Sequence, residues 1–153
     1  MTPAAEGPKS SAIGCDEIWL RTSQSFLEPF CISVERLSPA ALAYLGDAVY
    51  ELYMRTCYLI PPRRIQAYHR LVVAQVRAEA QAQHLESLAS HLTDAEKEIL
   101  RRGRNATPKR RSRAAPEIYQ QATSFETLIG YLYLTDIHRL KAVLALLELP
   151  ATE

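Results

Sequence analysis

The sequence predicts an all-α fold, and three observations support this prediction. Its 153 residues suit one domain with a single core. Hydrophobic residues make up 48% of the chain and recur at spacings of three and four, the helical period. No segment shows the alternation of apolar and polar residues that is typical of a half-buried strand. We therefore expect a helical bundle in residues 36–150, preceded by a partly mobile N-terminal extension in residues 1–35.

The first strong helix is predicted to begin at Ser38. In the extension before it, only the hydrophobic patch at residues 18–30 suggests a helix. Ser38 is a good N-cap, and Pro39 suits the first helical position. Apolar side chains recur at helical spacing from Leu42 onward. Two consecutive prolines after Ile60 are expected to end the helix.

Four further helices are expected along the chain. Residues 64–88 predict one long helix, because apolar residues line one face and the remainder is rich in Ala, Gln and Glu. Thr93 and Glu96 form a capping box that starts a short helix. The last two helices are predicted at residues 116–134 and 137–149, with a proline at the start of the first and another after the second.

Positive charge is concentrated in one segment. The chain has 18 basic and 17 acidic residues, and a net charge of +1 does not indicate a general polyanion binder. Seven of the basic residues lie between Arg101 and Arg113, a stretch without acids. We expect Gly103 to close the short helix, so that the basic stretch follows as a projecting loop shaped by Pro108. This charge density suits phosphate binding, although such runs are more often only solvated.

The composition also excludes several classes of protein. Three cysteines without C-x-x-C spacing indicate neither a disulfide framework nor a zinc site. No apolar run approaches the roughly 20 residues that a membrane span needs, and the N-terminus lacks a signal-peptide pattern. We therefore expect a cytoplasmic protein without a membrane partner.

Acidic residues stand in two helices that are otherwise apolar. The helix after Ser38 is apolar on almost every side, so we expect it to be buried, with Tyr44 in the core. Asp47, Glu51 and Arg55 form one polar line along it at a spacing of four. Because an unpaired buried carboxylate costs several kcal/mol, one interpretation pairs Glu51 with Arg55 and Asp47 with a base from elsewhere.

Glu126 is the acid in the second apolar helix, and Gly130 lies one turn further on. Glycine lowers helix propensity by about 1 kcal/mol relative to alanine, so a close helix crossing is one explanation for it. Alternatively, Asp47 and Glu126 converge on a hard cation such as Mg²⁺, which prefers oxygen ligands. Two metal-holding acids beside a phosphate-binding loop are the parts needed to hydrolyse a nucleic-acid backbone.

Both acidic stretches resemble the ribonuclease III family. Residues 42–51 (LAYLGDAVYE) resemble the signature helix of its catalytic domains, and residues 122–134 (ATSFETLIGYLYL) resemble its second acidic motif. With RRGRNA at residues 101–106 between them, the sequence is most similar to the short bacterial branch, the Mini-ribonucleases III. The resemblance covers about residues 37–149.

The resemblance implies a homodimeric ribonuclease III endonuclease domain-like helical bundle whose joint cleft takes double-stranded RNA. It implies that Asp47 and Glu126 are catalytic and bind the metal, for which we expect Mg²⁺. We also expect Glu51, one turn from Asp47, to support these two acids without binding the metal itself. Ribonuclease III proper has two further acids where this sequence has Ala43 and Thr123, a reduction that the short branch shares. The implied reaction leaves 5′-phosphate products. The implied substrate is the precursor of large-subunit (23S) ribosomal RNA, with a ribosomal protein or pre-ribosome as a further partner.

The RNA-binding residues implied by the resemblance lie in the basic stretch. Because the sequence ends at Glu153, we expect no separate domain for binding double-stranded RNA, so affinity rests on the dimer cleft and this stretch. The residues concerned are Arg101, Arg102, Arg104, Asn105, Lys109, Arg110, Arg111 and Arg113.

Two other functions stay open at this point. One is a non-catalytic dimer that binds structured RNA or assists ribosome assembly, since Ala43 and Thr123 leave few metal ligands. The other is a helical interaction protein whose acids are all paired with bases. Cleavage of duplex RNA that depends on Mg²⁺ would distinguish the nuclease hypothesis from both of these alternatives.

Overall fold

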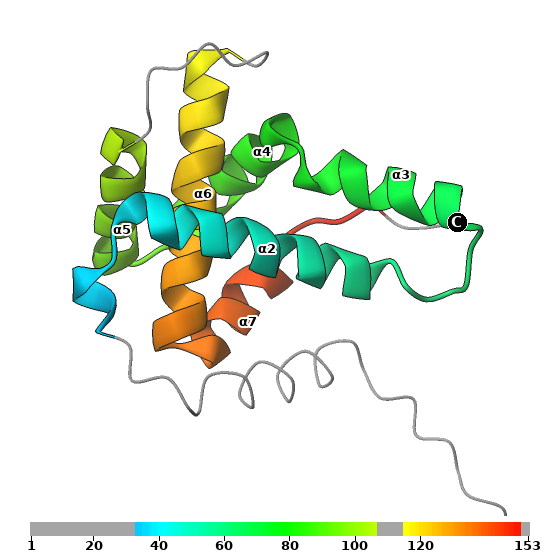
Figure 1. Cartoon of the computed structure of the whole chain (residues 1–153), viewed down its shortest axis with the longest axis horizontal. Coiled ribbons are helices and arrows are strands. Elements are labelled where there is room, and N and C mark those ends of the chain that lie inside the picture. The colour runs from blue at the N-terminus through cyan, green and yellow to red at the C-terminus, as the bar shows by residue number, and fades with distance from the viewer. Residues whose placement is uncertain (1–32, 107–114, 151–153) are drawn as a thin grey trace, which may run out of the picture.

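The structure, a computed structural model, describes residues 33–106 and 115–150, and this part of the chain is helical without strands (Figure 1). The predicted all-α class is therefore confirmed. None of the described helices is both long enough and apolar enough to cross a membrane. In chain order the elements are η1 (Val34–Arg36), α2 (Pro39–Cys57), α3 (Ile65–Val76), α4 (Ala78–Leu88), η2 (Ala89–His91), α5 (Asp94–Ala106), α6 (Pro116–Thr135) and α7 (Ile137–Ala145).

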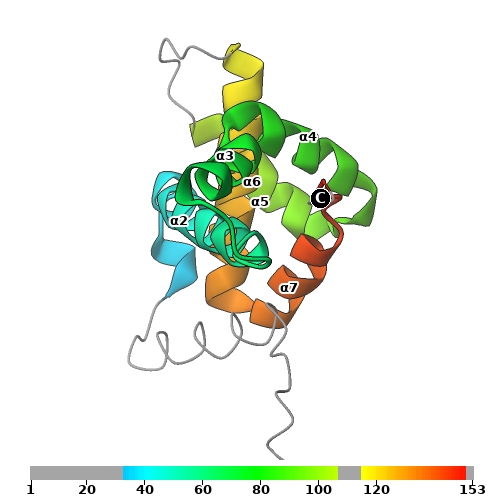
Figure 2. The same ribbon diagram turned by 90° about the vertical axis from the view of Figure 1, so that its right-hand side faces the viewer.

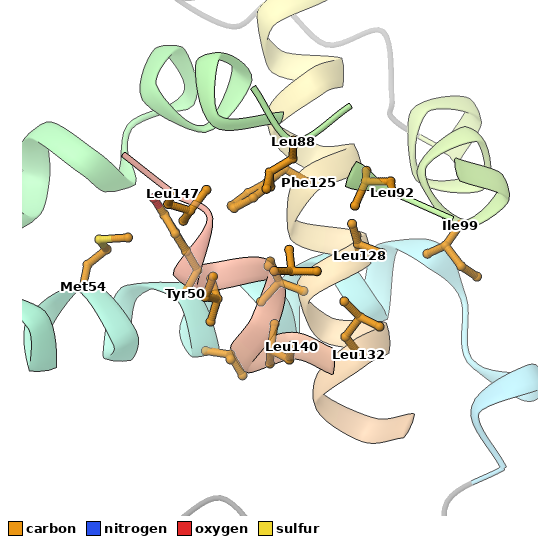
Figure 3. Packing of buried hydrophobic residues seen from close by; sticks show 14 of the residues in the cluster. Tyr50, Met54, Leu88, Leu92, Ile99, Phe125, Leu128, Leu132, Leu140 and Leu147 are labelled. Carbon is orange, nitrogen blue, oxygen red and sulfur yellow. The ribbon is translucent and has the colours of Figure 1, made fainter. Parts of the chain in front are cut away.

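Helix α6 is the centre of the bundle, and α2, α4, α5 and α7 all pack against it. After a quarter turn, α2 lies on one side of α6 while α4 and α7 lie on the other (Figure 2). Side chains from these helices form one hydrophobic core, which Figure 3 shows from close by. Its fully buried members include Tyr50, Phe125, Leu128 and Leu140. Because α6 carries most of these contacts, its exposed residues are held in fixed positions.

The predicted helix starts are confirmed. The Ser38 hydroxyl accepts a hydrogen bond of 3.1 Å from the backbone N–H of Ala41, so it caps α2 as expected. Thr93 and Glu96 form the capping box of α5, since each side chain accepts a hydrogen bond from the other residue's backbone N–H. Glu96 also binds Arg139 of α7, with 2.7 Å between Oε1 and Nε. This ion pair fixes α7 to the start of α5.

The single long helix predicted at residues 64–88 is wrong, because the chain breaks at Arg77. The Arg77 backbone is extended, with ψ at 153°, and separates α3 from α4. The side-chain amide of Gln81 donates to the carbonyl of Val76, which the break leaves without a helical partner. The break lets α3 pack against α2 while α4 packs against α6. Tertiary packing therefore overrides a strong local preference for helix.

Gly103 does not close α5, contrary to the prediction. The helix continues through it to Ala106, and Gly103 is buried against α6. A Cβ atom at this position would come within 2.8 Å of the Thr127 Cβ and 3.2 Å of the Ser124 Cα. The glycine is thus required for close approach of two helices, and the first four of the proposed RNA-binding residues are helical rather than in a loop.

Two helix ends also differ from the predictions. Helix α2 ends at Cys57 rather than after Ile60, and α7 ends at Ala145 rather than near residue 149. Residues 18–30 lie outside the described part of the chain. So do Lys109, Arg110, Arg111 and Arg113 of the predicted basic loop.

The expectation that α2 is buried all round is wrong. Tyr50 and Met54 are fully buried, but Tyr44 is 85% exposed and Leu52 is 51% exposed. The exposed residues recur at helical spacing and form one apolar face of α2, made of Tyr44, Ala48 and Leu52. Hydrophobicity alone does not distinguish a core face from a face that another molecule covers.

Candidate active site

Helices α2 and α6 cross with their backbones in direct contact. A Cβ atom added to Gly46 would overlap the carbonyl oxygen of Glu126, and one added to Gly130 would overlap that of Leu42. Only glycine fits at both positions, so the close crossing suggested for Gly130 is confirmed. The two acids stand beside this crossing: Asp47 follows Gly46, and Glu126 lies one turn before Gly130.

The crossing brings Asp47 and Glu126 to one pocket. They line an open cavity of about 290 Å³ at the surface. Two further lining residues, Ala43 and Thr123, occupy the positions at which the resemblance implied missing acids. The remaining lining residues are Ala40, Tyr44, Ala106 and Tyr119. Residues 79 positions apart in the sequence are therefore assembled into one site, with small side chains that leave room for a ligand.

Both carboxyl groups have pKa values above their ordinary range, and burial is the first cause for each. Burial, followed by the negative charge of Asp47, raises the pKa of Glu126 to about 7, against a smaller lowering by a hydrogen bond from Gln81. Burial, followed by the charge of Glu51, raises the pKa of Asp47. A carboxylate pair in this state favours the binding of a proton or a cation, because either relieves the repulsion.

The described bases do not neutralise this pair. Within residues 33–106 and 115–150, neither Asp47 nor Glu126 forms an ion pair. Glu51, by contrast, binds Arg55 through two hydrogen bonds. Among the described residues, the interpretation that paired both acids of α2 with bases is therefore confirmed for Glu51 and finds no partner for Asp47. Glu51 lies one turn beyond Asp47 and does not line the pocket.

The donor set suits a hard divalent cation that keeps most of its water. The described residues hold no group of three or more potential metal ligands among His, Cys, Asp and Glu. Two carboxylates in an open pocket nevertheless fit Mg²⁺, which is often held in proteins by one or two carboxylates together with water and substrate phosphates. The alanines in the wall leave space for that water.

The described part of the basic stretch lies next to the pocket. Arg101, Arg102, Arg104 and Asn105 belong to the last turns of α5, whose final residue, Ala106, lines the cavity. The Arg101 guanidinium donates two hydrogen bonds to the Glu98 carboxylate, of 2.8 Å from Nε to Oε2 and 2.6 Å from Nη2 to Oε1. Arg102 and Arg104 make no ion pair with the described residues, so their charges are available to an anionic ligand.

A second basic surface was missed by the sequence analysis. No acid occurs between Glu51 and Glu79, whereas this stretch contains five arginines. Three of them, Arg63, Arg64 and Arg70, line a wide hollow at the start of α3. The signal was present in the sequence, but the arginines are spread over the stretch and do not form a continuous run.

Comparisons with known proteins agree with these features. A family profile described as "Ribonuclease III domain" matches residues 40–136. The chain is 62% identical over 128 residues to a protein named Mini-ribonuclease 3 from Synechocystis sp., covering 83% of this chain and 90% of that one. It is 54% identical over 121 residues to a Mini-ribonuclease 3 from Thermosynechococcus vestitus, covering 79% and 80%. A crystal structure of a Fusobacterium nucleatum protein superposes with a TM-score of 0.68 at 31% identity, covering 76% and 96%.

Proposed function

The chain belongs to the ribonuclease III family, and from this membership we propose that Asp47 and Glu126 hold the divalent cation with which it cleaves RNA. It is an endoribonuclease for double-stranded RNA. The observation that supports the assignment is the convergence in one open pocket of two carboxylates that pair with no base in residues 33–106 and 115–150. We propose Mg²⁺ as the cation, because oxygen donors and retained water suit it.

The proposed reaction is hydrolysis of a phosphodiester bond. Water attacks the phosphorus atom, the bond to the 3′ oxygen breaks, and that oxygen takes a proton, which leaves a 5′ phosphate and a 3′ hydroxyl. A divalent cation at this site supplies charge neutralisation at the phosphate and makes water a better nucleophile at neutral pH. Asp47 and Glu126 would hold the cation in the open pocket. Glu51, one turn beyond Asp47 and paired with Arg55, is proposed to support Asp47 from outside the pocket.

The arginines beside the pocket are proposed to bind the RNA backbone. Arg102 and Arg104 carry charges that no described acid pairs with, and Arg101 and Asn105 lie on the same helical turns. Together with Lys109, Arg110, Arg111 and Arg113 they would neutralise phosphates over several nucleotides. Binding of this kind weakens steeply with salt, and replacing Arg102 and Arg104 by Gln should reduce the slope of log K against log salt by about one to two.

We also propose that two copies of the chain act together. The apolar face of α2 (Tyr44, Ala48 and Leu52) is a surface that a second copy would cover, and Tyr44 stands beside the pocket that holds Asp47. A dimer joined there would place two active sites near one duplex, so that each cuts one strand.

The natural substrate is proposed to be the precursor of 23S ribosomal RNA. This proposal rests on the resemblance to the Mini-ribonucleases III, which implies that substrate, and on the 62% identity to a protein of that name. A transcript spanning the ends of that precursor should be cut at defined positions by the purified protein. A ribosomal protein or the pre-ribosome is the further partner to test, by adding it to the same reaction.

The central test is the substitution Glu126→Gln, which keeps the shape of the side chain and removes its charge. Cleavage of a purified RNA duplex in Mg²⁺ should be lost, while duplex binding and the circular dichroism spectrum stay close to wild type. Glu86→Gln, the same change on the exposed surface of α4, is the control and should cleave normally. Undiminished cleavage by Glu126→Gln, or wild-type cleavage that persists in EDTA, would show that the assignment is wrong.

A further inference from the structure

The pocket wall formed by α6 contains a residue that the proposed chemistry does not use. Tyr119, Thr123 and Glu126 are spaced by four and three residues, so they lie along one face of the helix. At a rise of 1.5 Å per residue, Tyr119 stands about 10 Å from Glu126 along the helix axis. Tyr119 therefore lines the same pocket about two helical turns from Glu126.

The Tyr119 side chain has no partner among the described residues. It is 36% exposed, and its hydroxyl forms no hydrogen bond with them. Two other tyrosines show the usual arrangement, since the Tyr50 hydroxyl donates to the backbone carbonyl of Gln75 and the Tyr68 hydroxyl donates to the backbone carbonyl of Arg55. The small apolar residues Ala40 and Ala106 line the same pocket and leave space beside the phenol.

We propose that the Tyr119 hydroxyl binds the ribose–phosphate backbone of the RNA, a few nucleotides from the bond that is cut. This inference rests on the proposed function, because it needs the RNA strand to pass over the pocket. A phenol hydroxyl both donates and accepts hydrogen bonds, so it can bind a phosphate oxygen or a ribose 2′-hydroxyl. Most contacts of proteins to duplexes go to phosphate and sugar, and paired bases are not free to stack on the ring. Tyr119 thus acts in substrate binding.

The test is Tyr119→Phe, which removes only the hydroxyl. It is made in the Glu126→Gln background, so that affinity for an RNA duplex is measured without cleavage. Loss of one hydrogen bond should raise the Kd about fivefold. Tyr131→Phe in the same background is the matched control, because Tyr131 lies on the same helix outside the pocket lining, and its Kd should stay within twofold.

Kinetics separate this role from a structural one. In the otherwise native enzyme, Tyr119→Phe should raise KM about fivefold while kcat stays within twofold, because the bond that is cut lies elsewhere. A kcat that falls with unchanged KM, or a Kd equal to that of the control, would overturn the proposal. Wild-type protein that fails to cut duplex RNA would instead contradict the proposed function, so the two failures are distinguishable.

A substituted duplex identifies the group that Tyr119 contacts. Single riboses near the cut are replaced by deoxyribose, one position at a time. If the partner is a 2′-hydroxyl, the replacement at one position should weaken binding by the protein that keeps Tyr119. The same replacement should not change binding by the Tyr119→Phe protein. If the partner is a phosphate oxygen, the effect of Tyr119→Phe should persist at every position. The first result supports a 2′-hydroxyl contact. The second excludes it and requires the same comparison with single methylphosphonate linkages, where loss of the Tyr119→Phe effect at one linkage supports a phosphate contact and its persistence at every linkage overturns the proposal.

Discussion

Glu126 has a protonation equilibrium that is coupled to folding in the metal-free protein. Its pKa is raised from 4.5 to about 7, first by burial and then by Asp47, so the folded state binds the proton more tightly than the unfolded state. This stabilisation is fully present below pH 4.5 and is lost as the pH rises through 7. A bound cation would replace the proton as the group that relieves the repulsion.

The free energy of unfolding should therefore fall with pH in the absence of metal. A shift of this size corresponds to at most about 3 kcal/mol, because one pKa unit is about 1.4 kcal/mol. Glu126→Gln cannot ionise and should be more stable than wild type at pH 8, with a smaller difference at pH 5. Urea denaturation in EDTA at both pH values measures this. Parallel pH dependences for the two proteins would contradict the raised pKa.

The sequence identified some site residues and missed others for physical reasons. Asp47 and Glu126 were recognisable because a charged side chain in an apolar helix needs a partner or a ligand. Tyr44 was wrongly placed in the core, since its apolar neighbours are the same for a core and for an interface. Tyr119 was missed because a phenol carries no charge and its spacing from Glu126 has meaning only when the pocket is known.

At the level of the helices, the crossing of α2 and α6 depends on two glycines. Gly46→Ala and Gly130→Ala each place a Cβ atom against a backbone oxygen, which cannot move without moving the helix. We expect each to destabilise the fold by at least about 3 kcal/mol. Gly103→Ala is the comparison, because its nearest atom belongs to the side chain of Thr127, and it should cost less. Thermal unfolding measures all three, and an equal cost would contradict the backbone explanation.

At the break between α3 and α4, by contrast, a substitution of Arg77 is expected to stabilise the fold. This residue is the N-cap of α4, but its side chain makes no capping hydrogen bond. Arg77→Ser should therefore stabilise the protein by about 1 kcal/mol, because serine is a good N-cap. In a continuous helix the same change would be unfavourable. Denaturant unfolding decides between them, with the exposed position Arg70→Ser in the middle of α3 as the control that should lose stability.

Helix starts were predictable from sequence, whereas breaks and continuations were not. Ser38, the Thr93 and Glu96 capping box, and Pro116 act within one turn of chain, so local sequence determines them. The break at Arg77 and the passage of α5 through Gly103 follow from packing on α6, which local sequence does not contain. Local propensity therefore described where helices begin better than where they end.

For the molecule as a whole, the apolar face of α2 determines the expected state of association. Tyr44→Lys and Leu52→Lys place charge on this face without touching the buried side of the helix. Both should shift the protein from dimer to monomer in sedimentation velocity and lower cleavage of both strands. Leu146→Lys, at a partly exposed apolar position after α7, is the control and should stay dimeric. A wild-type protein that sediments as a monomer would contradict the dimer.

Because of the contact between Gly46 and Gly130, we expect thermal stability and metal affinity to respond differently to substitutions in the core. Because backbone atoms meet there, the closest approach of α2 to α6 beside Asp47 and Glu126 is limited by the backbone and not by the larger side chains of the core. Mild truncations at distant core positions such as Leu140 or Ile99 should lower the melting temperature well before they alter metal affinity. Heat tolerance in this enzyme could thus be selected or engineered in the core without retuning its chemistry.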